Sequence, residues 1–207
     1  FVKQLQTALQ RSKATTLHVK DIPYNQVLVS GLGGSGIGAS IVQEYILDKL
    51  SIPFIVNKDY FIPKSVQKNT LFIACSYSGN TEETIQAFHA ARKTKAKIVC
   101  VTSGGVLSAL AKTHHCDLIT IPSGMPPRAC LGYSFVQLLF ILKKAGLLKT
   151  NFEKEILEGI QHINKERTQI QKSAHKIATS LTDKEIAIYT IAGREALAIR
   201  FRQQLNE

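Results

Sequence analysis

The sequence predicts an α/β protein built on a parallel β-sheet. Between Gln26 and Pro122, apolar runs of strand length alternate with amphipathic stretches of helix length. The strand-length runs are apolar throughout, and two of them end in loops rich in glycine and serine. Apolar strands that alternate with helices are typical of βαβ units, in which helices cover both faces of a parallel sheet. We therefore expect a five-stranded parallel sheet between two helical layers.

The expected strands of this sheet are, in chain order, Val27–Leu32, Phe54–Asn57, Leu71–Ser76, Ile98–Thr102 and Leu118–Ile121. The main helices between them are expected to begin after Ser35, Asn80 and Gly105. Cys75 and Cys100 each lie at the end of an apolar run, where a small buried thiol is expected. Together with an N-terminal helix, these elements form a predicted first domain of residues 1–150.

A helical tract follows the predicted sheet. Residues 135–148 and 153–180 have helical spacing with no strand between them, so we expect a helical linker over 151–182. Glu185–Ile191 is another apolar run, and Arg194–Glu207 again has helical spacing. We expect residues 183–207 to be the opening strand and helix of a second α/β domain whose remainder is absent.

Composition and charge exclude several classes of protein. With 44% hydrophobic and 20% charged residues the chain is an ordinary globular protein. Its longest strongly apolar run, 135–142, is far shorter than the roughly 20 residues of a membrane-spanning helix. The net charge of +11 is scattered along helices, which does not favour a nucleic-acid partner. The four cysteines have no metal-ligand spacing and the start has no leader pattern, so we predict a cytoplasmic protein.

The first loop contains Gly31, Gly33 and Gly36 in the G-x-G-x-x-G spacing of a dinucleotide-binding turn. Such a turn also requires an acidic residue at the end of the second strand, to bind the ribose hydroxyls. That strand ends at Asn57, and Asp59 comes only after a lysine. The incomplete pattern disfavours NAD as the ligand.

The second loop, "ACSYSGNTEET", places three hydroxyl side chains within six positions: Ser76, Ser78 and Thr81. A helix is predicted to start directly after them, and its free N–H groups and positive dipole end attract anions. The alternative is a helix cap formed by Asn80 or Thr81. Three hydroxyls exceed what a cap requires, so the loop favours a phosphorylated small molecule.

Five motifs carry a resemblance to a known family: "GLGGSGIG", "SYSGNTEET", "VTSGG", "PPRACLGYSF" and "RFRQQLNE". They occur in the order and approximate spacing of the bifunctional phosphoglucose/phosphomannose isomerase family, whose members contain two sugar isomerase (SIS) domains. The resemblance implies a SIS-type three-layer αβα sandwich. It also implies an enzyme that interconverts glucose 6-phosphate and/or mannose 6-phosphate with fructose 6-phosphate.

The resemblance implies roles for individual residues. The substrate and its phosphate would be bound by Gly34, Ser35, Ser76, Ser78 and Thr81. The catalytic pair would be Arg128, after the paired prolines, and Glu207 of the "LNE" motif. Aldose–ketose isomerisation through an enediolate needs one base that serves both carbons and a cation near the developing oxyanion. It needs no redox cofactor and no metal.

The resemblance further implies a homodimer with residues of both subunits in each site, and the helices after Gly132 offer surface for such an association. It also implies a histidine and a lysine beyond the "LNE" motif, and none of the six histidines of this chain stands in a matching context. The alternative function is a non-catalytic SIS module that binds a phosphosugar as a regulator. Arg128 with Glu207 favours the enzyme, because a sensor needs a phosphate loop but no proton-transfer base.

Overall fold

The computed structural model describes residues 1–206 and divides into two compact units. The first unit consists of Phe1 and Lys3–Thr150, and the second consists of Val2 and the residues from Asn151 onward. Every strand of the described chain belongs to the first unit. The candidate site is therefore built from the first unit.

The first unit contains one parallel sheet. Its strands are β1 (Gln26–Ser30), β2 (Phe54–Asn57), β3 (Thr70–Cys75), β4 (Lys97–Thr102) and β5 (Asp117–Thr120). All four neighbouring pairs are parallel and the strand order is β2-β1-β3-β4-β5. The predicted five-stranded parallel sheet is confirmed. Because β2 lies on one side of β1 and β3 to β5 extend on the other, the chain direction across the sheet reverses between β1 and β3.

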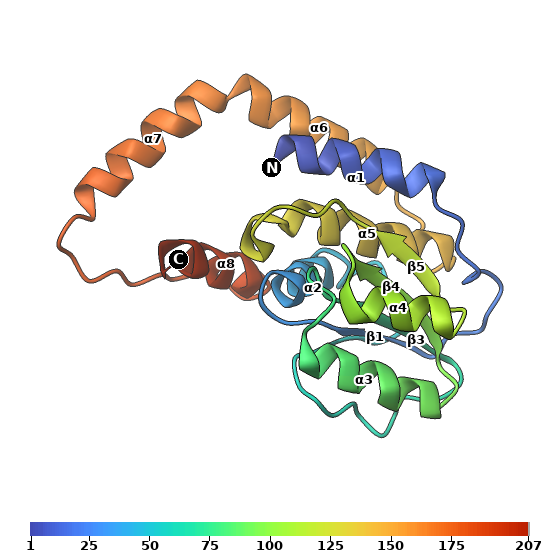
Figure 1. Cartoon of the computed structure of the whole chain (residues 1–207). Coiled ribbons are helices and arrows are strands. Elements are labelled where there is room, and N and C mark those ends of the chain that lie inside the picture. Colours follow the sequence, from blue (N-terminus) through green and yellow to red (C-terminus); the bar gives the residue numbers. More distant parts are fainter. Residues whose placement is uncertain (207) are drawn as a thin grey trace. The chain divides into compact units, whose positions relative to one another are not determined.

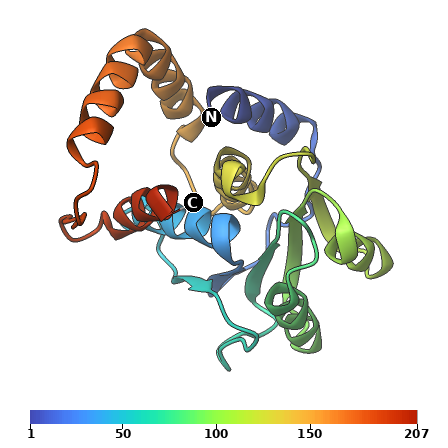
Figure 2. The ribbon, with the colours of Figure 1, turned by 60° about the vertical axis from the view of Figure 1, so that its left-hand side comes forward.

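Helices cover both faces of this sheet, as predicted. The helices of the first unit are α1 (Val2–Ala14), α2 (Gly33–Tyr45), α3 (Glu82–Lys93), α4 (Gly105–Thr113) and α5 (Leu131–Lys144). α2 and α5 pack against one another on one face, and α3 and α4 lie on the other (Figures 1 and 2). α1 lies over α5, where the Gln137 side chain donates to the Ala8 carbonyl at 3.0 Å. The three-layer αβα sandwich thus carries one additional outer helix.

Alternate strand residues supply the two halves of the core. Leu28 and Phe72, neighbours across β1 and β3, pack with Phe88 of α3 and Leu107 of α4. The next strand positions point to the opposite face, as the period of two in a strand requires. Both halves are completely buried, which fixes the sheet register and the position of each strand end.

The cysteines lie in this core as expected. All four are free thiols, and Cys75 and Cys100 are buried. Burial raises the pKa of the Cys75 thiol to about 12, and it raises the pKa of Cys100 as well. Both thiols are therefore protonated and unreactive at neutral pH.

The second unit is helical. Its helices are α6 (Phe152–Lys165), α7 (Arg167–Ser180) and α8 (Glu195–Asn206). The stretch 153–180, for which helical spacing was expected, forms two helices, and Glu166 lies between them. The segment Glu185–Ile191, expected to be the opening strand of a second domain, is irregular in the structure, and a strand needs a hydrogen-bonded neighbour that the described part of this unit does not offer. The second domain stays a prediction. None of the helices that the structure describes is long and apolar enough to cross a membrane.

Candidate functional site

The reversal between β1 and β3 brings the two glycine- and serine-rich loops together. The loop after β1 leads into α2, and the loop after β3 leads into α3. A Cβ atom on Gly31 would lie 2.8 Å from the carbonyl oxygen of Cys75, so the two backbones touch. The Ser35 and Cys75 side chains both lie beside Gly31, with their Cβ atoms 3.2 and 3.4 Å from the Cβ that Gly31 would carry, and Cys75 is one residue before Ser76. In open α/β sheets this point, beyond the carboxyl ends of the strands, is where ligands bind.

The loop after β3 holds its hydroxyl groups in a compact turn. Ser76 Oγ and Thr81 Oγ1 are 2.8 Å apart, and the Gly79 N–H donates to Ser76 Oγ at 3.1 Å. The Asn80 N–H donates to Ser78 Oγ at 3.2 Å. Ser76 is buried, Thr81 is half-buried and Ser78 is exposed, so the turn runs from the core to the surface. The structure therefore brings all three predicted phosphate ligands into one loop.

The alternative of a helix cap does not describe this loop. Thr81 occupies the N-cap position of α3, but its side chain makes no capping hydrogen bond. Asn80 instead reaches a different helix, because its Oδ1 accepts from the Val106 N–H in the first turn of α4 at 3.0 Å. The hydroxyl of Thr81 is turned toward Ser76 and away from the backbone of α3. A cap would not require that arrangement.

The loop after β4 supports the phosphate loop from the side. Ser103 Oγ donates to the Tyr77 carbonyl at 2.6 Å. Gly79 has φ +73° and lies so close to the Gly104 carbonyl that an added Cβ would overlap it. The "VTSGG" segment thus packs directly against the "SYSGNT" segment and supports its conformation. Sequence reasoning noted both motifs but did not identify Ser103 and Asn80 as the residues that join the loops.

The arginine turn lies against the start of α2. Arg128 is in the 3₁₀-helix Pro127–Ala129 and is exposed. A Cβ on Gly34 would lie 2.8 Å from the Pro127 carbonyl oxygen and 3.7 Å from Arg128 Cα. Gly34 therefore permits a close approach of the two backbones. The structure brings Arg128 to the same edge of the sheet as Ser35 and the phosphate loop.

Two residues of this edge were missed by sequence reasoning. Lys58 directly follows β2, and its Cε lies 3.5 Å from the Cβ that Gly36 would carry, which places a cation beside the first turn of α2. The Tyr77 side chain is buried between the loop serines, and its hydroxyl accepts from the Met125 N–H at 3.1 Å. Burial raises the pKa of Tyr77, so its hydroxyl stays protonated. Lys58 could have been found from the sequence, because it directly follows the second predicted strand and so lies at the carboxyl edge of the sheet.

Glu207, the predicted base, lies outside the described residues, so its role stays a prediction. The remaining predicted site residues are all placed by the first unit, at one edge of the sheet. Hydroxyl groups, a helix start and an arginine in this arrangement can bind an anion and stabilise a second negative charge.

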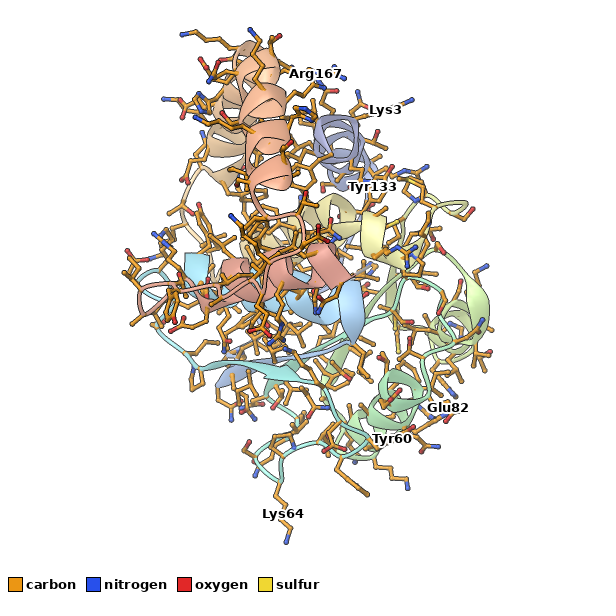
Figure 3. All side chains as sticks on the ribbon, turned by 90° about the vertical axis from the view of Figure 1, so that its left-hand side faces the viewer. Lys3, Tyr60, Lys64, Glu82, Tyr133 and Arg167 are labelled. Atoms are coloured by element: carbon orange, nitrogen blue, oxygen red, sulfur yellow. The ribbon has the colours of Figure 1, made fainter. Side chains whose placement is uncertain are left out.

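A hollow of about 940 Å³ lies between α3 and the loop that follows β2. Its walls are mostly apolar, with Phe61, Pro63 and Ile85 among them. At its rim the Tyr60 hydroxyl donates to Glu82 at 3.4 Å, and Figure 3 shows these two side chains near each other. The lining holds Glu82 together with Lys64 and Lys93 but no group of hydroxyls at the start of a helix, so we assign phosphate binding to the loops at the carboxyl edge and not to this hollow.

Comparison with known proteins agrees with this geometry. The family model of the SIS domain matches residues 22–139. The chain is 40% identical over 99% of its length to the bifunctional phosphoglucose/phosphomannose isomerase of Caldicellulosiruptor bescii, and 30% identical over 91% to the D-glucosamine-6-phosphate 4-epimerase of Sulfolobus acidocaldarius. It covers 62% and 60% of these relatives, so it spans about three fifths of their length.

A solved structure shows the same fold. The C-terminal domain of glucosamine-fructose-6-phosphate aminotransferase from Francisella tularensis superimposes with a TM-score of 0.68 at 16% identity. The match covers 99% of this chain and 64% of that one. The expected resemblance and the SIS-type sandwich are both confirmed, and the chain belongs to the SIS domain family.

Proposed function

We propose that this protein is an aldose–ketose isomerase that interconverts glucose 6-phosphate and/or mannose 6-phosphate with fructose 6-phosphate. The observation that carries the proposal is the meeting of three features at one sheet edge: the hydroxyl-rich loop after β3, the first turn of α2 and the arginine turn. The name of the Caldicellulosiruptor bescii relative supports the same reaction.

The loop after β3 holds the phosphate of the sugar in this proposal. Ser76, Ser78 and Thr81 present hydroxyl groups, and the start of α3 adds N–H groups and a positive dipole end. Hydroxyls that hydrogen-bond to a dianion form charge-assisted bonds, which are about twice as strong as neutral ones. The phosphate therefore supplies most of the affinity and leaves the rest of the sugar free to react.

Arg128 stabilises the charge that develops during the reaction. When the proton on C2 of the aldose leaves, the electron pair spreads over C1, C2 and their oxygens, forming an enediolate. A guanidinium keeps its positive charge at every relevant pH and can donate two parallel hydrogen bonds to neighbouring oxygens. Ser35 and the backbone at Gly34 lie beside the arginine turn, where they would contact the sugar chain.

Glu207 moves the proton in this mechanism. Its carboxylate would accept the proton from C2 of the aldose and return it to C1 of the same intermediate, while the hydroxyl proton moves from O2 to O1, which yields the ketose. The reverse direction removes the proton from C1 of fructose 6-phosphate. One base thus serves both carbons, and no electron is transferred to a cofactor.

We propose that the active form is a cytoplasmic homodimer. The helix α7 has no buried residue, and the apolar side chains of Ile170 and Ile177 are about half exposed. A second copy of the chain would cover such surface. The free cysteines fit a reducing compartment. Sedimentation of the full-length protein as a monomer at micromolar concentration would contradict the dimer.

Isomerisation by the wild-type protein and by Glu207→Gln tests the function. The substitution keeps the shape of the side chain but removes the base, so the rate should fall at least ~100-fold. Uptake of solvent deuterium at C1 of fructose 6-phosphate should fall in parallel, and affinity for that sugar should change little. A wild-type rate in the variant would remove Glu207 from the mechanism.

Two outcomes would assign a different function. A wild-type protein that binds fructose 6-phosphate but neither isomerises it nor exchanges its C1 proton would be a regulator. Inversion at C4 of glucosamine 6-phosphate, with no ketose formed, would match the name of the Sulfolobus acidocaldarius relative. Product analysis by NMR distinguishes these outcomes.

A further inference from the structure

The hydroxyl of Tyr77 joins the phosphate loop to both ends of the arginine turn. It accepts from the Met125 N–H at 3.1 Å, before the turn, and it lies close enough to the Cys130 thiol, after the turn, for each group to influence the pKa of the other. The Cys130 thiol in turn donates to the Pro126 carbonyl at 3.3 Å. The turn that carries Arg128 is therefore attached to Tyr77 by a hydrogen bond before its start, and the Cys130 thiol beside Tyr77 bonds the end of the turn back to Pro126.

Tyr77 itself is held firmly. Its side chain is 9% exposed, and its carbonyl accepts from the Ser103 side chain at 2.6 Å and from the Ser103 N–H at 3.0 Å. Ser76 and Ser78, on either side of it, are the proposed phosphate ligands. A buried tyrosine has only two rotatable side-chain bonds, so its hydroxyl group is held in a nearly fixed position relative to the backbone of the loop.

We propose that Tyr77 is a positioning residue that fixes Arg128 relative to the phosphate loop. The proposal rests on the proposed function, in which Arg128 binds the enediolate oxygens. Tyr77 would act on the part of a ligand that Arg128 contacts, and it would not act on the phosphate. The hydrogen bond of Cys130 gives this cysteine a role that the small apolar residue usual at its position in the resembled family would not have.

The test measures the binding of two probes to the full-length protein by calorimetry. Inorganic phosphate reports on the loop after β3 alone. 6-Phosphogluconate carries a carboxylate at C1, whose negative charge resembles that of the enediolate. For Tyr77→Phe we expect affinity for 6-phosphogluconate to fall about 10-fold, because a small displacement of a charged partner costs that much or more. Affinity for inorganic phosphate should stay within twofold, which also shows that the variant is folded.

A double-mutant cycle with Arg128→Ala tests whether Tyr77 acts through the arginine. Residues that act through one another have non-additive effects. In the Arg128→Ala protein, adding Tyr77→Phe should change the affinity for 6-phosphogluconate less than twofold. Tyr24→Phe is the matched control, because its buried hydroxyl donates to the Val19 carbonyl at 3.0 Å, away from the arginine turn. This control should leave both affinities unchanged.

The outcomes separate this inference from the proposed function. If Arg128→Ala binds 6-phosphogluconate as wild type does, the proposed role of Arg128 fails, and the inference fails with it. If Arg128→Ala weakens binding but Tyr77→Phe does not, or if the two effects add, the inference alone is overturned. Equal weakening of both probes by Tyr77→Phe would also overturn it, since that result indicates a distorted phosphate loop.

Discussion

The two edges of the central sheet use polar residues in opposite ways. At the amino edge, where the strands begin, polar side chains are hydrogen-bonded to other parts of the protein. At the carboxyl edge, where the strands end, the Thr81 hydroxyl is bonded to the Ser76 hydroxyl, and the hydroxyls of Ser30 and Thr84 have no partner among the described residues. The comparison indicates that the amino edge contributes stability and that the carboxyl edge keeps its hydrogen-bonding capacity for a ligand.

Asp117 is the centre of the amino edge. Its buried carboxylate accepts from the Lys97 ammonium at 3.0 Å and from the backbone N–H and ring Nδ1 of His18, each at 2.9 Å. His18 belongs to the segment between α1 and β1, so the contacts attach this segment to β4 and β5. Both oxygens of the carboxylate accept hydrogen bonds from other groups of the protein.

The carboxyl edge presents the contrasting case. Ser30 ends β1 and Thr84 lies in the first turn of α3, and both side chains are completely buried. Neither hydroxyl has a hydrogen-bond partner within residues 1–206, which the structure describes. A buried hydroxyl without a partner lowers stability by about 1–3 kcal/mol. The two hydroxyls therefore contribute less to stability than the fully paired carboxylate of Asp117 does.

The largest expected effect is on ligand binding at the carboxyl edge. The double substitution Ser78→Ala with Thr81→Ala removes two hydroxyls from the phosphate loop. We expect fructose 6-phosphate to bind about 2 to 4 kcal/mol more weakly, roughly 30- to 900-fold, because each lost bond is charge-assisted. Thermal unfolding should change little. Unchanged affinity in calorimetry would reject this loop as the phosphate site, and tight NAD binding would revive the dinucleotide interpretation.

The second effect is on stability at the amino edge. Asp117→Asn removes the charge that Lys97 faces, and we expect a loss of about 1–3 kcal/mol in the free energy of unfolding at pH 7. The lower part of this range is favoured because the Lys97 and His18 side chains are 24% and 77% exposed and can turn to water. Urea denaturation measures the loss. Affinity for fructose 6-phosphate should not change, since Asp117 lies at the opposite edge.

The pH dependence of that loss follows from the same carboxylate. Burial raises the pKa of Asp117, but the hydrogen bonds from His18 and Lys97 outweigh it and hold the pKa below its ordinary value. A depressed native pKa means that the stabilisation is present above the unfolded value of about 4 and is lost as the pH falls through the native value. The difference between wild type and Asp117→Asn should therefore shrink below about pH 4. A difference that grows in acid would contradict this assignment.

Much of the fold could be predicted because its signals are local. The inner strands β1 and β3 are largely apolar runs buried on both faces, whereas the edge strands β2 and β5 are less buried. The strand expected over Glu185–Ile191 has the same apolar character but no neighbour to pair with in the described unit. An apolar run forms a strand only together with a hydrogen-bonded neighbour, so this expectation stays a prediction.

The sequence predicted those parts of the candidate site whose residues lie together in one loop. Ser76, Ser78 and Thr81 are close in sequence, so their pattern alone indicated a phosphate loop. Arg128 was found only through resemblance, since a lone arginine in a proline-bounded loop has no distinctive local pattern. The link through Tyr77 joins loops 48 residues apart and could not be predicted without the fold.

The smallest expected effects come from the same substitution, threonine to valine, made once at each edge of the sheet. Thr70, at the amino edge, and Thr84, at the carboxyl edge, are both completely buried. Thr70 Oγ1 accepts from the Gln26 side chain at 3.1 Å and from the Gln67 N–H at 3.0 Å, whereas Thr84 Oγ1 has no partner. Valine has nearly the same shape as threonine but no hydroxyl group.

Thr70→Val should lower the free energy of unfolding by about 1–2 kcal/mol, because the buried Gln26 amide and the Gln67 N–H each lose a hydrogen bond to Thr70. Thr84→Val should leave that free energy unchanged or raise it by up to about 1 kcal/mol, because no hydrogen bond is lost and an unpaired hydroxyl is removed. Urea denaturation of both variants under one set of conditions provides the measurement. Since both substitutions remove the same hydroxyl from equally buried positions, only the hydrogen bonds of the two edges distinguish them. Equal losses in the two variants would show that both edges hold their hydroxyl groups for stability, and the contrast between them would be wrong.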